Sequence, residues 1–109
     1  MMSGQSHTAT VTIVNPQGLH MRPAYLFAEM AARYTSRIEV VKDDMRIDGK
    51  SVLSILTLGA AQGTTVELVG TGPDACDAIE TLANLVNLGF PGETENGAAK
   101  QPKPGNGSP

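Results

Sequence analysis

The sequence predicts a single α+β domain in which a four-stranded antiparallel sheet is covered on one face by three helices. Its 109 residues are enough for one domain and too few for two of ordinary size. Some segments have alternating apolar residues, as strands do, and others have apolar residues at helical spacing. They follow one another in the order β-α-β-β-α-β-α, which is a split β-α-β pattern. Because aromatic residues make up only 4% and tryptophan is absent, the core must be aliphatic.

The domain is expected to span residues 8–89, between a loose N-terminal segment of residues 1–7 and a disordered tail of residues 90–109. Eight of the nineteen residues from Pro91 to Pro109 are proline or glycine, and this segment has no apolar periodicity. A segment of this composition lacks the apolar surface that would offset the entropy cost of ordering it.

The first strand is expected over residues 8–14, where apolar residues alternate with threonines, and the turn residues 15–18 end it. A helix follows, with Pro23 in its first turn, where the missing N–H costs nothing. One face of this helix carries an apolar stripe with helical spacing, formed by Ala24, Phe27, Ala28 and Ala31.

The next two strands form a predicted hairpin. Ile38 and Val40 mark the second strand, residues 45–47 mark the third, and the charged residues 42–44 join them. A hairpin at this point makes these two strands neighbours in the sheet.

Ser51 begins a short predicted helix that runs to Leu58 and stops before Gly59. A serine in this position caps a helix, because its hydroxyl accepts a hydrogen bond from a backbone amide of the first turn. The fourth strand follows over residues 64–69, with two apolar residues on one face.

The last helix is expected over residues 73–88, with Gly89 at the left-handed position that commonly ends a helix. Asp74 and Asp77 lie near its N-terminal end, where negative charge interacts favourably with the helix dipole. Its apolar stripe consists of Ala75, Ala78, Ile79, Leu82, Leu85 and Val86.

Composition excludes several classes of protein. The net charge of −3 argues against a nucleic-acid binder, which usually carries a basic surplus on one face. Cys76 is the single cysteine, without a CxxC partner or a nearby histidine, so we expect no disulfide, no metal and no cofactor. No secretory signal is evident, and no apolar run approaches the ~20 residues of a membrane helix, which predicts a cytoplasmic protein without membrane insertion.

The segment most informative about chemistry is residues 18–24, between the strand-ending turn and the first helix. The start of a helix presents unpaired amides and a partial positive charge that favour a bound anion. His20 beside that end is a candidate nucleophile in the neutral form, and Arg22 can pair with phosphate oxygens. Pro23 stiffens the turn and helps to hold His20 outside the helix. These features suit phosphoryl transfer, although a single histidine before a helix is usually a solvated or capping residue.

The residues of this segment, Gly-Leu-His-Met-Arg-Pro-Ala, resemble the phosphorylation motif of HPr, the histidine-containing phosphocarrier family of the phosphoenolpyruvate-dependent sugar phosphotransferase system. The resemblance continues through residues 49–59, Gly-Lys-Ser-Val-Leu-Ser-Ile-Leu-Thr-Leu-Gly, and residues 62–64. It covers roughly residues 8–88 with the expected order and spacing. It implies the HPr-like open-faced β-sandwich, which agrees with the element order above.

Carried over to this chain, the resemblance implies that His20 is the phosphorylated histidine and Arg22 the arginine that stabilises the phosphate. Enzyme I would deliver the phosphoryl group from phosphoenolpyruvate, and a IIA domain of a sugar permease or a regulatory partner would receive it. The protein would then be a carrier, expected to be monomeric, rather than a turnover enzyme.

Ser51 is a second candidate site. Its structural interpretation is the helix cap described above. The resemblance implies in addition that an HPr kinase/phosphorylase phosphorylates the serine matching Ser51 in many members, and a phosphate at a helix N-terminus is electrostatically tolerated. Ser54, one turn further along, is the less favoured alternative. Whether this chain is regulated in this way stays open at the level of sequence.

The short helix carries more apolar residues than one sheet can bury. We expect Ile55 and Leu58 to face the core, which leaves an apolar docking patch beside His20. The alternative is a helix that is merely too hydrophobic and has no partner. The predicted patch consists of Met21, Val52, Leu53 and Leu56.

The predicted fold class is compatible with two other functions. A regulatory module on the same scaffold would act by docking and by Ser51 phosphorylation without phosphoryl relay, but it would not need His20. An RNA-binding domain would need aromatic residues on its central strands, and the predicted strands at residues 8–14 and 64–69 contain none. Tyr25 and Glu29 depart from common HPr residues on the first helix, which leaves the identity of the partners open.

Overall fold

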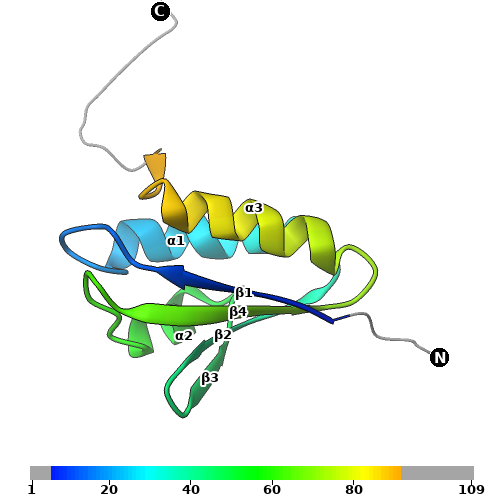
Figure 1. The fold of residues 1–109 in the computed structure, drawn as a ribbon, viewed down its shortest axis with the longest axis horizontal. Helices are drawn as coiled ribbons and strands as arrows, with labels where there is room; N and C mark the ends of the chain where they lie inside the picture. The colour runs from blue at the N-terminus through cyan, green and yellow to red at the C-terminus, as the bar shows by residue number, and fades with distance from the viewer. Residues whose placement is uncertain (1–5, 92–109) are drawn as a thin grey trace, which may run out of the picture.

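The computed structural model describes residues 6–91, and within them the seven elements follow the predicted order (Figure 1). The hairpin turn and the apolar stripes lie where the sequence analysis placed them. The elements are β1 (Ser6–Thr12), α1 (Met21–Ala31), β2 (Arg37–Lys42), β3 (Met45–Asp48), α2 (Val52–Thr57), β4 (Thr65–Thr71) and α3 (Ala75–Asn87).

The four strands form one antiparallel sheet in the order β1-β4-β2-β3. Val40 on β2 lies opposite Leu68 on β4 and Ile47 on β3, so these side chains share one face. Val40 and Leu68 are buried, whereas Glu67 and Arg46, which alternate with them along the strands, are exposed. Because successive side chains of a strand point to opposite faces, the sheet has one apolar face and one solvated face.

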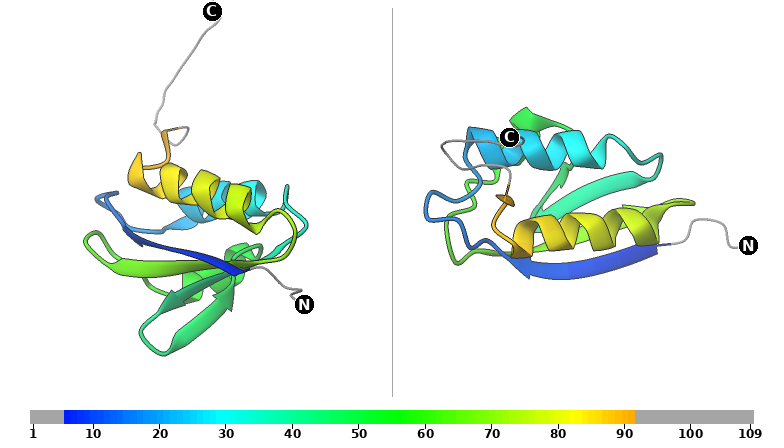
Figure 2. Two further views of the ribbon diagram at one scale, coloured as in Figure 1. Left: turned by 45° about the vertical axis from the view of Figure 1, so that its right-hand side comes forward. Right: turned by 90° about the horizontal axis from the view of Figure 1, so that it is seen from above.

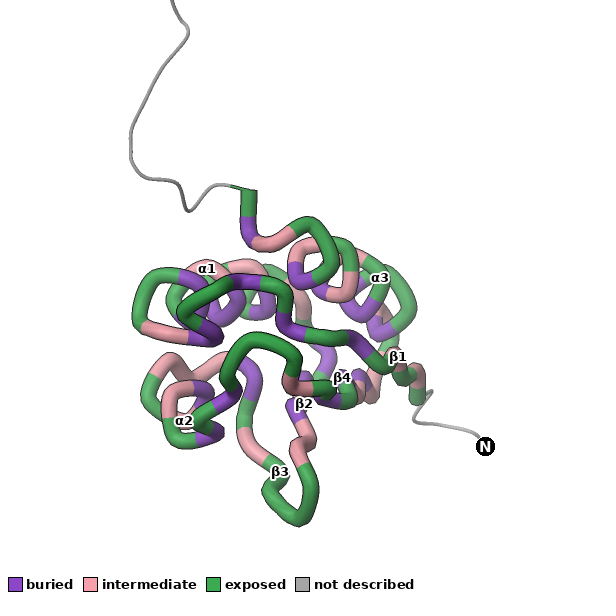
Figure 3. The backbone as a smooth tube through the Cα atoms, turned by 60° about the vertical axis from the view of Figure 1, so that its left-hand side comes forward, coloured by how far each residue is buried: buried purple, intermediate pink, exposed green. Residues whose placement is uncertain are grey.

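The three helices supply the other half of the core (Figure 2). α3 packs over β1 and β4, α1 lies between α3 and α2, and α2 contacts β3. Buried and exposed residues alternate along the helices (Figure 3), and the predicted stripes of α1 and α3 supply most of their buried residues. The predicted sandwich with three helices on one face is confirmed.

The domain extends further at both ends than residues 8–89. β1 begins at Ser6, and His7 is half-buried and paired with Gly70. The expectation of a loose segment up to residue 7 is therefore wrong for residues 6 and 7. Phe90, assigned by sequence to the tail, is buried in the core with a backbone φ of 57°. Phe90 joins Phe27 as a second buried aromatic residue of the core. The predicted loose N-terminus and disordered tail otherwise fall on residues 1–5 and 92–109, which lie outside the described residues.

Asp74 ties two loops together at the end of the sheet remote from His20. Its carboxylate accepts hydrogen bonds from the backbone amides of Thr35 and Ser36, each at 2.9 Å, and the amide of Asp74 donates to the Ser36 hydroxyl. Asp74 occupies the capping position of α3 without a side-chain bond to that helix. Besides its expected interaction with the helix dipole, Asp74 therefore links the α1–β2 loop to the start of α3.

These contacts predict a specific pH dependence of stability. The Ser36 side chain and the amides of Thr35 and Ser36 lower the pKa of Asp74 from 3.8 to about 2. The carboxylate therefore stabilises the fold fully above about pH 4, and this contribution is lost as the pH falls through about 2. Asp74→Asn should lower the urea midpoint at pH 7, and the difference from the unsubstituted protein should shrink towards pH 2.

Asp77→Asn is the matched control, because Asp77 also lies in the first turn of α3 but is exposed. It should change the urea midpoint less than Asp74→Asn at pH 7. An equal loss from Asp74→Asn at pH 2 and pH 7 would contradict the role assigned to the Asp74 carboxylate.

Candidate functional site

His20 lies immediately before α1, in the capping position and outside the helix. Its backbone is extended (φ −79°, ψ −170°), and its carbonyl accepts the first helical hydrogen bond from the Ala24 amide at 3.0 Å. The amides of Met21 and Arg22 have no acceptor within the helix, and Pro23 in the third position has no N–H. His20 is half-buried and directly precedes these two amides, at the positive end of the α1 dipole.

The loop before His20 is held from the side of α2. The Leu19 amide donates to the carbonyl of Ala60 at 2.9 Å, and Leu19 itself is buried. Gly18 has a φ of +69° and packs so closely that a β-carbon there would lie 2.3 Å from the Ala60 carbonyl oxygen. Glycine is required here both for the left-handed backbone and for the close approach.

The same loop is held from the side of α3 by Asn15. The Asn15 carbonyl accepts from the Gly18 amide at 2.9 Å, and its side-chain Nδ2 donates to the Gly89 carbonyl at 3.0 Å. The local sequence at Asn15 predicts only a turn. A partner 74 positions away leaves no local signal, so only the fold reveals this contact.

Arg22 is exposed on the first turn of α1, two residues from His20. Its guanidinium carries a permanent charge and several donors in a planar fork, which match phosphate oxygens. Together with the free amides of the first turn, it provides an environment in which a phosphoryl group next to His20 would be stabilised.

Ser51 caps α2 as the sequence predicts. Its hydroxyl accepts a hydrogen bond from the Ser54 amide at 3.2 Å, and the side chain is half-buried. The structural role is therefore confirmed, and it leaves the hydroxyl oxygen near the surface at the start of a helix.

The predicted docking residues do not have equal exposure. Leu53 is 75% exposed and Met21 is 60% exposed, whereas Val52 and Leu56 are half-buried and pack partly against the core. Ile55 and Leu58 are buried, as predicted from the spacing. Met21 on α1 and Leu53 on α2 are thus the exposed members of the predicted set, on two helices that contact each other.

Two lysines have roles that sequence analysis missed. Lys42 Nζ donates to the Leu58 carbonyl at the end of α2, at 3.0 Å, and Lys50 Nζ donates to the Tyr34 carbonyl just after α1, at 2.7 Å. A cation there interacts favourably with the negative end of the helix dipole. Each partner is 16 positions away, so local sequence contains no indication of it.

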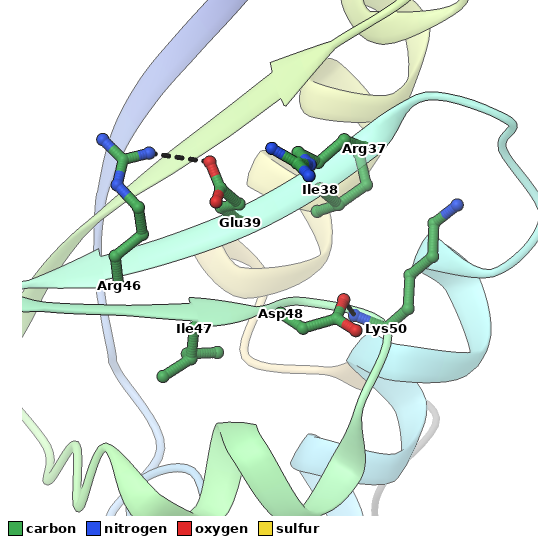
Figure 4. Close-up of a pocket in the computed structure, with 7 residues that line it drawn as sticks. All are labelled: Arg37, Ile38, Glu39, Arg46, Ile47, Asp48 and Lys50. Atoms are coloured by element: carbon green, nitrogen blue, oxygen red, sulfur yellow. Dashed lines mark hydrogen bonds and ion pairs between the residues drawn. The ribbon is translucent and has the colours of Figure 1, made fainter.

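A hollow of about 420 Å³ lies at the β2–β3 hairpin (Figure 4) and is lined by Arg37, Ile38, Glu39, Arg46, Ile47, Asp48 and Lys50. Arg46 and Glu39 form an ion pair at 2.7 Å, and the Lys50 amide donates to the Asp48 carboxylate. None of its lining residues is among those proposed for phosphoryl transfer. Within residues 6–91, no three His, Cys, Asp or Glu side chains gather as a metal site requires, and none of the helices has the length and apolarity of a membrane span.

The family comparison agrees with this geometry. Residues 7–87 match the family described as PTS HPr component phosphorylation site. The chain belongs to the HPr family. This membership places it among the phosphocarriers of the phosphotransferase system, with the fold and the motif that the sequence resemblance implied.

Individual HPr relatives cover most of the chain. The phosphocarrier protein HPr of Neisseria meningitidis serogroup A is 38% identical over 86 residues, which are 79% of this chain and 96% of the relative. The HPr-like protein Crh of Bacillus subtilis is 39% identical over 69 residues, which are 63% of this chain and 81% of Crh.

Two crystal structures from Thermoanaerobacter tengcongensis share the fold. HPr-C-His matches with a TM-score of 0.76 and 39% identity, over 78% of this chain and 96% of that one. A structure described as an HPr dimer matches with a TM-score of 0.63 and 40% identity, over 75% and 94% of the two chains. HPr-family chains with this fold therefore include at least one described as a dimer.

Proposed function

We propose that the protein accepts a phosphoryl group on His20 from phosphorylated enzyme I and passes it to a IIA domain or a regulatory partner of the phosphotransferase system. One observation is the main support for this proposal. His20 is held outside α1, at the helix end where amides and the dipole favour an anion.

The chemistry needs no cofactor. A ring nitrogen of neutral His20 attacks phosphorus, and the new P–N bond forms as the bond to enzyme I breaks, leaving its electron pair on enzyme I. The resemblance implies Nδ1 as the reacting nitrogen. Arg22 and the first-turn amides balance the charge on the three phosphoryl oxygens. Transfer onward follows the same path in reverse, so the protein is a carrier rather than a turnover enzyme.

The apolar patch supplies the docking surface in this proposal. Met21 on α1 and Leu53 on α2 are exposed, and Val52 and Leu56 on α2 are partly buried against the core. Methionine suits a surface that meets several partners, because its flexible side chain can repack. Enzyme I and IIA domains would then dock over His20 in turn, since one phosphoryl group passes from one to the other.

The decisive experiment is incubation of the full chain with phosphoenolpyruvate and enzyme I. Intact mass spectrometry should detect one added phosphoryl group that is lost in mild acid, because protonation of the imidazole makes it a good leaving group. If no phosphoryl group is taken up from any enzyme I tested, the carrier function is wrong.

We further propose that an HPr kinase/phosphorylase phosphorylates Ser51 and that this slows phosphoryl acceptance at His20. The added charge would lie on the face that partners approach. ATP and the kinase should give one acid-stable phosphate that Ser51→Ala abolishes and Ser54→Ala retains. An acid-stable phosphate that persists in Ser51→Ala would contradict this assignment.

A regulatory module without phosphoryl relay is the second candidate. The similarity to Crh favours it, because the name of that relative sets it apart from the phosphocarriers as HPr-like. The two functions differ in the assay with enzyme I: only the carrier takes up an acid-labile phosphoryl group, whereas both can be modified on Ser51.

The proposed carrier acts as a monomer in the cytoplasm. One copy presents His20, Arg22 and the apolar patch on adjacent helices, so a second copy is not needed to complete the site. A relay fed by phosphoenolpyruvate works where that metabolite is made. Light scattering should give the mass of one chain.

A further inference from the structure

Asn15 is a buried polar residue in the loop that leads to His20. Its side chain is 6% exposed, and such burial is costly unless the polar atoms are hydrogen-bonded. The Nδ2 group donates a hydrogen bond to the Gly89 carbonyl at 3.0 Å, just beyond the end of α3. An apolar residue would be easier to bury in a loop, so the amide indicates a requirement for this contact.

The partner of Asn15 is itself rigidly held. Gly89 has a φ of +74°, and the next residue, Phe90, is buried and donates its amide to the Leu85 carbonyl at 2.9 Å. The turn after α3 is therefore anchored in the core by Phe90. Asn15 links the His20 loop to this anchored turn rather than to a free end of the chain.

The Asn15 link completes a two-sided support of the loop. On one side, Leu19 is bonded to Ala60 after α2, and on the other, Asn15 is bonded to Gly89 after α3. The Asn15 carbonyl also accepts the Gly18 amide, so displacement of Asn15 reaches the residues next to His20 directly. Two anchors on opposite sides restrict the loop more than either one does alone.

We propose that Asn15 is a positioning residue for phosphoryl transfer: its bond to Gly89 holds His20 in register with the N-terminus of α1. This inference rests on the proposed function. A reacting nitrogen must stay aligned with phosphorus, and small misplacements of reacting groups slow a reaction strongly. Asn15 is therefore assigned a positioning role, exerted through its contacts with Gly89 and Gly18.

The test compares Asn15→Ala and Asn15→Asp with Tyr34→Phe. Tyr34 Oη donates to Thr81 on α3 at 3.0 Å, so the control also removes one partly buried hydrogen bond between α3 and the rest of the fold. It does so away from the His20 loop. Asn15→Asp keeps the shape of the side chain but replaces the donor with a charged acceptor facing a carbonyl.

Rates of phosphoryl uptake from phosphorylated enzyme I are measured at a temperature at which thermal melts show every variant fully folded. Both Asn15 variants should lower the maximal rate about tenfold and leave the KM for enzyme I within about twofold, because the Met21–Leu53 patch is untouched. Tyr34→Phe should stay within about twofold of the unsubstituted protein in both parameters.

A second measurement does not depend on enzyme I. The imidazole resonances of His20 and the amide resonances of Leu19 should shift in the Asn15 variants and stay unchanged in Tyr34→Phe. Unchanged His20 resonances and a maximal rate equal to that of Tyr34→Phe would overturn the positioning role. If the unsubstituted protein takes up no phosphoryl group, the proposed function fails instead, while the resonances still report whether Asn15 positions His20.

Discussion

His20→Ala is expected to eliminate acid-labile phosphorylation by phosphoenolpyruvate and enzyme I. The imidazole is the nucleophile in the proposed transfer, and no neighbouring group can replace its ring nitrogen, because guanidinium groups and backbone amides are not nucleophilic. Because His20 is only half-buried and makes no side-chain cap to α1, alanine should be tolerated by the fold. Intact mass before and after mild acid, together with a circular dichroism melt, checks both expectations.

His7→Ala is the matched control, because His7 is the other histidine of the chain. His7 lies on β1, opposite Gly70, and outside the α1 end that carries the proposed chemistry. It should take up one acid-labile phosphoryl group as the unsubstituted protein does. An acid-labile group that persists in His20→Ala and disappears in His7→Ala would show that the site assignment is wrong.

Gly18→Ala should lower the free energy of unfolding by about 2–5 kcal/mol. A left-handed backbone costs a residue with a β-carbon about 1–2 kcal/mol. Relieving the contact with the Ala60 carbonyl, at 2.3 Å, costs about 1–3 kcal/mol more, because backbone rather than a flexible side chain must move. Since Leu19 is bonded to the same carbonyl, the shift should also slow phosphoryl uptake. Urea unfolding measures the first effect and the enzyme I assay the second.

Gly59→Ala separates the two causes. Gly59 also has a left-handed backbone, with a φ of +59°, but a β-carbon there would meet nothing within 4 Å. Its substitution should therefore cost only about 1–2 kcal/mol. The excess loss in Gly18→Ala measures the close approach of the loop to Ala60. Equal losses in the two variants would mean that this approach contributes nothing to stability.

Much of the fold could be predicted because its signals are local. The alternation in β2 and the stripe of α1 follow from the periods of strand and helix, and a buried face leaves little freedom in register. The cap at Ser51 and the glycine at residue 89 were predictable for the same reason, since capping involves residues within one turn.

The ends of the domain were less predictable. Phe90 follows a helix-ending glycine and precedes a segment rich in proline and glycine, so its composition suggests a tail. Its burial depends on how the chain packs after α3, which no local pattern reports. His7 was similarly assigned to a loose end, although pairing with Gly70 extends β1 to include it.

The sequence by itself determined the element order, the apolar faces and the placement of His20 before a helix, because these depend on residues a few positions apart. The roles of His20, Arg22 and Ser51 in phosphorylation stay predictions that the experiments above test. Only the tertiary structure decided how the His20 loop is held. The contacts of Asn15 with Gly89 and of Leu19 with Ala60 join residues 74 and 41 positions apart. Such bonds form only after the sheet and helices have packed, so the local sequence pattern does not predict them.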